Sequence, residues 1–165
     1  MRRTVLFAAV VLSIVVESTF FIFFSIRGVL PNISMLFILC LALYDEEGDV
    51  LWLGLAAGLM KDVVVGRMVG ISALTFMLIG YTLFRVNRKF FEDHLTTPLL
   101  ISIFATLFHE SVYLLFVFLL GYPVSFFDAL TGIWLIQLAY NFLLVTPVFL
   151  FVRKLLKWRV MNQQY

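Results

Sequence analysis

The segment from residue 54 to residue 70 reads Gly54-Leu-Ala-Ala-Gly58-Leu-Met-Lys61-Asp62-Val-Val-Val-Gly66-Arg67-Met-Val-Gly70. A glycine or an aspartate recurs at every fourth position. Residues four apart lie on the same face of a helix, so Gly54, Gly58 and Asp62 are predicted to form a smooth groove that ends in a carboxylate. Within a membrane, such a groove lets another helix approach closely, and a carboxylate there is costly. The segment therefore predicts a specific contact face on a membrane helix.

The five positions cannot all share that face, because a helix drifts by about 40° over four residues. We expect the helix to end between Val63 and Gly66, and Gly66 and Gly70 to permit a turn into the next helix. Lys61, near the end of the helix, is expected to extend its ammonium group toward the lipid headgroups.

The composition predicts an integral membrane protein. Of the 165 residues, 63% are hydrophobic and only 13% are charged, and the mean hydropathy is +1.07. A soluble domain of this size could not bury so much apolar surface. No domain boundary is visible, so residues 1–165 are expected to form one membrane domain.

Apolar runs bounded by polar clusters predict about six transmembrane helices in an all-α fold. The Arg2-Arg3 start with its long apolar run is interpreted as a first span rather than a signal peptide. The second and third runs are shorter than the roughly 20 residues that a full crossing needs, so five spans with a re-entrant segment is the alternative. The expected runs are 4–26, 30–44, 50–60, 69–84, 97–120 and 130–152.

The basic residues predict the orientation. With six crossings, nine of the twelve Lys and Arg residues fall on the side of the two termini, and Arg27, Lys61 and Arg67 fall on the other. The side with more Lys and Arg is cytoplasmic. Both termini are therefore expected in the cytoplasm.

Three polar residues within the apolar runs are expected to face protein. Glu17 lies near the middle of the first run, where a carboxylate costs roughly 2.5–3.5 kcal/mol. Gln137 and Asn141 are four residues apart on one face of the last run. Hydrogen bonds between helices are the simplest role for all three, and contact with a partner or ligand is the alternative for Glu17.

His109-Glu110, in the fifth run, is the best candidate for acid–base chemistry because histidine beside a carboxylate can relay protons. Neighbouring residues on a helix point about 100° apart, so we do not expect both side chains to line one small site. Buried hydrogen bonds between helices are the favoured role. The lone Cys40 fits no zinc or redox spacing, and no nucleotide-binding or HExxH motif is present. We expect no catalytic residue, metal, cofactor or nucleic-acid partner.

These patterns together resemble a known family. Pro31-Asn32 opens the second run, an acidic loop follows, and the segment 54–70 continues into Ile71-Ser-Ala-Leu, with Gly80-Tyr81 further on. This arrangement is similar to MreD, the bacterial rod shape-determining membrane protein. The specific part of the resemblance covers residues 31–81. The family commonly has Pro-Asp where this chain has Pro31-Asn32, so one charge is missing here.

The resemblance implies a multi-pass protein of the bacterial inner, or cytoplasmic, membrane. It would bind MreC, a single-span protein, in the elongation machinery with RodA, its penicillin-binding transpeptidase partner and MreB. The implied fold resembles the six-helix substrate-binding subunit of energy-coupling-factor transporters. Fold and partner packing are the roles implied for Gly54, Gly58 and Asp62, and no catalytic residue is implied.

The leading hypothesis is a non-enzymatic membrane scaffold that helps to regulate side-wall peptidoglycan synthesis and cell shape. The first alternative is a small-molecule-binding transporter subunit with a cavity lined by polar residues such as Glu17, Glu110, Gln137 and Asn141. A membrane enzyme that uses His109 and Glu110 is the second alternative.

Overall fold

The computed structural model describes residues 2–44, 48–65, 68–90, 95–122 and 129–161. All the regular elements of these residues are helical. Two short elements accompany the main helices: a 3₁₀-helix, η1 (Phe21–Phe24), and a π-helical segment, η2 (Ala129–Trp134). The main helices are α1 (Arg2–Thr19), α2 (Ile33–Ala42), α3 (Asp49–Val65), α4 (Ile71–Phe90), α5 (Thr96–Leu119) and α7 (Leu135–Met161).

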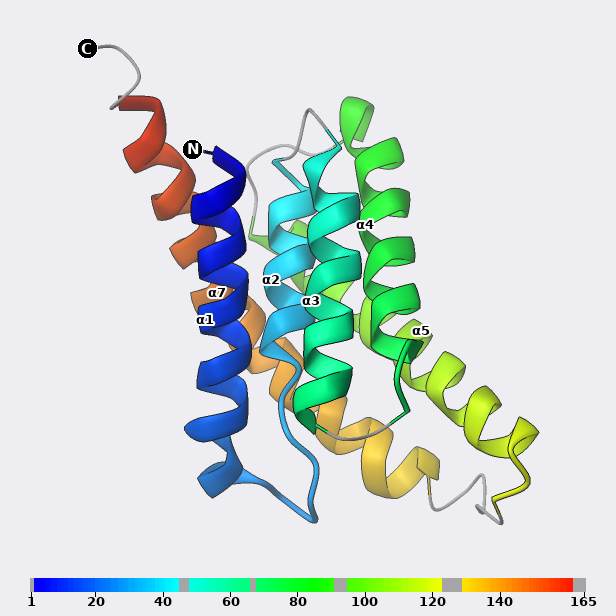
Figure 1. The fold of residues 1–165 in the computed structure, drawn as a ribbon. Helices are drawn as coiled ribbons and strands as arrows, with labels where there is room; N and C mark the ends of the chain where they lie inside the picture. The colour runs from blue at the N-terminus through cyan, green and yellow to red at the C-terminus, as the bar shows by residue number, and fades with distance from the viewer. Residues whose placement is uncertain (1, 45–47, 66–67, 91–94, 123–128, 162–165) are drawn as a thin grey trace.

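The helices run alternately up and down in one bundle (Figure 1). The start of α1 and the end of α7 lie at the same end of the bundle, and the chain passes from α1 to α2 and from α3 to α4 at the opposite end (Figure 1). We call these the terminal end and the far end. Every interaction described below for Glu17, Asn32 and Asp62 lies toward the far end.

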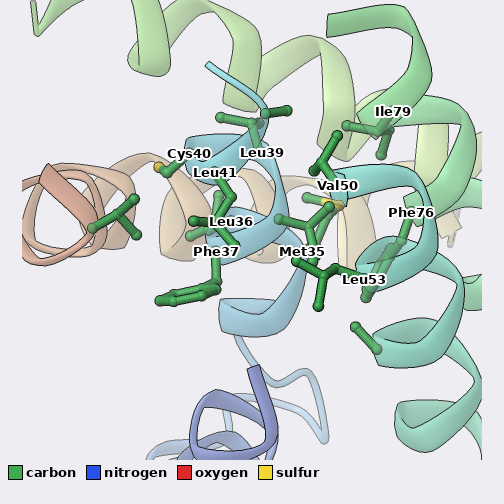
Figure 2. Packing of buried hydrophobic residues seen from close by; sticks show 14 of the residues in the cluster. Met35, Leu36, Phe37, Leu39, Cys40, Leu41, Val50, Leu53, Phe76 and Ile79 are labelled. Carbon is green, nitrogen blue, oxygen red and sulfur yellow. The ribbon is translucent and has the colours of Figure 1, made fainter. Parts of the chain in front are cut away.

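Helix α2 forms the centre of the bundle. All ten of its residues are buried, and it contacts α1, α3, α4, α5 and α7. Figure 2 shows its apolar side chains meeting those of α3 and α4, including Val50, Leu53 and Phe76. A helix that is apolar on every side is stable only when it is surrounded, and the other five helices provide that enclosure.

Three predicted boundaries of the membrane segments were wrong. The last run was expected to end at Val152, but α7 continues to Met161. The first run was expected to stay helical to Ile26, but α1 ends at Thr19 and is followed by η1 and a turn. Consecutive aromatic residues have modest helix propensity, and Arg27 and Gly28 both have positive φ angles, of 52° and 75°. The polar loop expected to begin at Arg85 starts later, because α4 continues to Phe90; arginine and lysine are good helix formers. Residues 91–94 of that loop lie outside the described residues.

Other expectations agree with the structure. Helix α3 ends at Val65, inside the predicted interval, and α5 matches the predicted fifth run within one residue at each end. Two segments, Thr96–Leu119 and Gly132–Leu156, are long and apolar enough to cross a membrane. Together with the large apolar side chains exposed on the outer faces of α1, α3, α5 and α7, they fit a membrane protein.

Candidate functional site: a buried polar network around the start of α2

Asn32 caps the first turn of α2. Its side-chain oxygen Oδ1 accepts a hydrogen bond of 3.2 Å from the backbone N–H of Met35, which is the usual way to satisfy an N–H at the start of a helix. Pro31, also buried, precedes it. The Pro31-Asn32 pair therefore sets where the central helix begins.

Glu17, from the end of α1, supports the same turn. Its Oε2 accepts hydrogen bonds of 2.9 Å from both the backbone N–H and the hydroxyl of Ser34. A carboxylate at a helix N-terminus is favoured by the helix dipole. Glu17 is only 3% exposed, so its carboxylate faces protein. It accepts from the backbone N–H of Ser34, a group in the first turn of α2 that has no acceptor within the helix.

Lys61, on α3, contacts both Glu17 and Asn32. Its Nζ lies 2.7 Å from Oε1 of Glu17 and also donates to Oδ1 of Asn32. The expectation that Lys61 extends toward the headgroups was wrong, because the side chain turns inward. A buried carboxylate needs a countercharge, and Lys61 provides it across the interface between α1 and α3.

Asn141, on α7, joins two more helices to the network. Its Oδ1 accepts from the backbone N–H of Asn32 at 3.0 Å, and its Nδ2 donates to Oγ1 of Thr106, on α5, at 2.9 Å. Asn141 is 1% exposed. The second amide of the predicted pair, Gln137, is also buried and lines a cavity beside the network.

Asp62 performs a similar task at the start of α4. Its Oδ2 accepts from the backbone N–H groups of Gly70, at 2.7 Å, and Ser72, at 3.1 Å. Gly70 has a φ of 104°, a conformation that glycine adopts at little cost. The carboxylate thus ties the end of α3 to the beginning of the next helix. Gly66 lies outside the described residues.

The glycine groove on α3 is filled by α4. A Cβ atom at Gly58 would lie 2.3 Å from the Cα and N atoms of Ala73, and one at Gly54 would lie 2.9 Å from the carbonyl oxygen of Phe76. The sequence suggested that this groove admits a partner's helix, and that suggestion needs correction: a helix of the same chain occupies it. The glycines do allow a helix to approach closely, as predicted, but that helix is α4 of the same chain.

His109 and Glu110 are both buried and both line the cavity beside the network. The expectation that adjacent helical residues would not share a site was wrong, because this cavity is bounded by five helices and the residues before α2, and is reached from more than one direction. Nδ1 of His109 forms a hydrogen bond of 2.8 Å with Oγ1 of Thr75, on α4. The imidazole also packs near Phe76, with ring centroids 5.7 Å apart.

The cavity itself is small. Water-sized molecules can occupy about 40 Å³ within it, which suits a few ordered waters. Its wall is rich in polar groups, among them Glu17, Lys61, Asp62, Glu110, Tyr113 and Gln137. Within the described residues, no three His, Cys, Asp or Glu side chains converge in a way that could hold a metal ion. The arrangement can support hydrogen bonding among helix ends.

Sequence reasoning missed three residues of the network. Ser34, Thr75 and Thr106 each bond to one of the polar residues that the sequence did single out. Serine and threonine within helices usually bond to their own backbone, and Thr75 and Thr106 also do so here. Their sequence positions therefore gave no separate signal of a contact between helices.

Comparison with known proteins identifies the family. The family model described as rod shape-determining protein MreD matches residues 1–159. The chain belongs to the MreD family. No curated protein and no solved structure matches it. Membership of the MreD family indicates a role in determining rod shape at the membrane, and the polar network gives this MreD-family chain its internal architecture.

Proposed function

We propose that this protein is a non-enzymatic, multi-pass scaffold of the cell-elongation complex in the bacterial cytoplasmic membrane. It binds an MreC-like single-span partner and so helps to regulate side-wall peptidoglycan synthesis, with RodA, a penicillin-binding transpeptidase and MreB as further members of the complex. The described residues form six main helices, and the start of α1 lies at the same end of the bundle as the end of α7 (Figure 1). Together with the distribution of Lys and Arg, this arrangement supports cytoplasmic termini.

One observation carries the proposal: the buried polar side chains Glu17, Asn32, Asp62 and Asn141 hold the ends of helices through hydrogen bonds to backbone N–H groups. Helix α2 is ten residues long, about 15 Å, and cannot cross a hydrocarbon core of about 30 Å by itself. Non-helical backbone within a membrane needs protein partners. Glu17, Asn32 and Asn141 supply these partners at the start of α2.

Because α4 fills the glycine groove, a partner's helix has to use an outer face. Three exposed apolar residues sample different faces: Trp52 on α3, Phe104 on α5 and Leu143 on α7. A photoreactive benzoylphenylalanine at each site, in cells that express the MreC-like protein, tests the proposal. We expect protein cross-links from one face and lipid adducts from the others. Phe76, fully buried, is the matched control, and absence of cross-links to the partner from every face would contradict the scaffold.

The size of the polar cavity weighs against a small-molecule-binding transporter subunit that uses Glu17, Glu110, Gln137 and Asn141. Pockets for such ligands usually measure about 300–1,000 Å³, far more than the 40 Å³ of this polar cavity. Native mass spectrometry of the purified protein tests this directly, and a stoichiometric bound organic molecule would favour the transport alternative.

The enzyme alternative is tested at His109 and Glu110. The double substitution His109→Gln and Glu110→Gln preserves approximate size and hydrogen-bonding capacity while removing both titratable groups. In a strain whose own gene is deleted, we expect the variant to maintain rod shape. Round cells that contain wild-type amounts of membrane-inserted variant would show that these groups have a chemical role.

A further inference from the structure

The segment from Phe20 to Ile26 forms an exposed apolar surface at the far end of α1. Phe23 is 85% exposed, and Phe20, Ile22, Phe24 and Ile26 are between 53% and 56% exposed. None of the residues of η1 is buried. The side chains of this segment therefore lie outside the core of the bundle.

This surface has a defined shape. The ring centroids of Phe20 lie 5.4 Å from those of Phe21 and of Phe24, so the three rings form a cluster. The hydroxyl of Tyr140, on α7, donates to the carbonyl oxygen of Phe24. The cluster is thus attached to the bundle by a hydrogen bond between segments far apart in the sequence.

A tight turn follows the cluster. The backbone N–H of Val29 donates to the carbonyl of Ile26 at 2.9 Å, and Arg27 and Gly28 at the tip have positive φ angles. Arginine in this conformation costs about 1–2 kcal/mol relative to its usual backbone geometry. The turn holds an exposed cation directly beyond the cluster of rings.

We propose that residues 20–27 are an anchor for the phospholipid interface of the leaflet at the far end, with the aromatic rings at the edge of the acyl chains and Arg27 at the phosphates. This inference rests on the proposed membrane embedding. The apolar part of α1, Thr4–Thr19, spans about 24 Å, which is short of a hydrocarbon core of about 30 Å. The four residues of η1 add about 8 Å, and the sum brings the rings to that boundary.

The chemistry of the segment favours lipid over a protein partner. Phenylalanine is common on the apolar face of segments that lie in the membrane interface beside Lys or Arg, and a guanidinium group forms strong paired hydrogen bonds with phosphate. The order along the chain, rings first and cation next, matches the order of acyl chain and phosphate across one leaflet. The same placement brings Glu17 close to the interface, where a buried carboxylate costs less than at the bilayer centre.

Site-directed spin labelling of the full chain in phosphatidylethanolamine–phosphatidylglycerol liposomes tests the anchor. Phe23→Cys, Arg27→Cys and Phe104→Cys variants are labelled one at a time; Cys40 is fully buried, and the unsubstituted protein serves as the labelling control. Collision rates with oxygen and with a water-soluble nickel complex report depth. We expect position 104 to be deepest, position 23 to lie about 5–10 Å below the phosphates, and position 27 to be the most accessible to nickel.

Two results would overturn the proposal. Equal, water-like accessibility at positions 23 and 27 would place the cluster in solvent, and shielding of position 23 from both reagents would place it under protein. The measurement is repeated with the MreC-like protein present, and we expect no change at position 23. Loss of partner binding with an unchanged label depth would count against the scaffold and leave the lipid anchor intact.

Discussion

The ion pair between Glu17 and Lys61 gives the sharpest prediction. Glu17→Gln keeps an acceptor for the N–H and hydroxyl of Ser34 but leaves the Lys61 ammonium, 12% exposed, without its carboxylate. Removal of one member of a buried pair typically costs about 3–5 kcal/mol. For a chain of this length that corresponds to a fall in melting temperature of about 6–20 °C.

The second substitution makes the prediction specific. Adding Lys61→Met to Glu17→Gln removes the unpaired charge and keeps an apolar side chain of similar length, so the double variant is expected to recover most of the lost stability. The assay is thermal unfolding in detergent and in lipid nanodiscs, analysed as a double-mutant cycle. Lys154→Met, at an exposed lysine, is the matched control and should change stability by less than about 0.5 kcal/mol. A double variant no more stable than Glu17→Gln alone would show that the unpaired Lys61 charge is not the cause of the lost stability.

Three further substitutions and one control substitution, Gly132→Ala, probe the helix contacts. Gly58→Ala places a Cβ atom 2.3 Å from the backbone of α4 and should prevent folding or greatly lower the melting temperature. Gly132→Ala, at a position with open space around it, should be neutral or slightly stabilising. Equal melting temperatures of the two variants would contradict the close packing of α3 on α4. Asp62→Asn removes the charge at the start of α4 and should cost about 1 kcal/mol in thermal unfolding, and an unchanged midpoint would contradict the cap. Asn141→Leu leaves the N–H of Asn32 without its acceptor and should cost about 1–3 kcal/mol; faster hydrogen exchange at that amide would locate the effect, and unaltered exchange would count against it.

Much of the fold could be predicted from the sequence because the signals are local. Hydropathy and charge clusters located the six main helices of the described residues but not η1 or η2, and the four-residue glycine spacing marked the face of a close approach between two helices. The drift of that spacing around a helix also predicted that α3 ends before Gly66, and it ends at Val65. Periodicity determines which residues share a face.

The choice of partner could not be predicted in the same way. The sequence marked the groove of Gly54 and Gly58 but could not distinguish a partner's helix from the chain's own α4. Lys61 was assigned to the headgroups for a similar reason, because its carboxylate partner lies 44 positions earlier and only the folded chain brings them together. A single sequence shows which side chains need partners, and the tertiary structure determines what those partners are.

We propose that the buried polar side chains of this protein hold helix ends in place and take part in no reaction. The most direct measurement is cell shape in a deletion strain complemented by the Glu17→Gln, Lys61→Met double variant, with its membrane level matched to wild type. We expect rod-shaped cells, since the neutral pair keeps the hydrogen bonds that begin α2 and carries no unpaired charge. Round cells in the presence of folded, membrane-inserted double variant would contradict it.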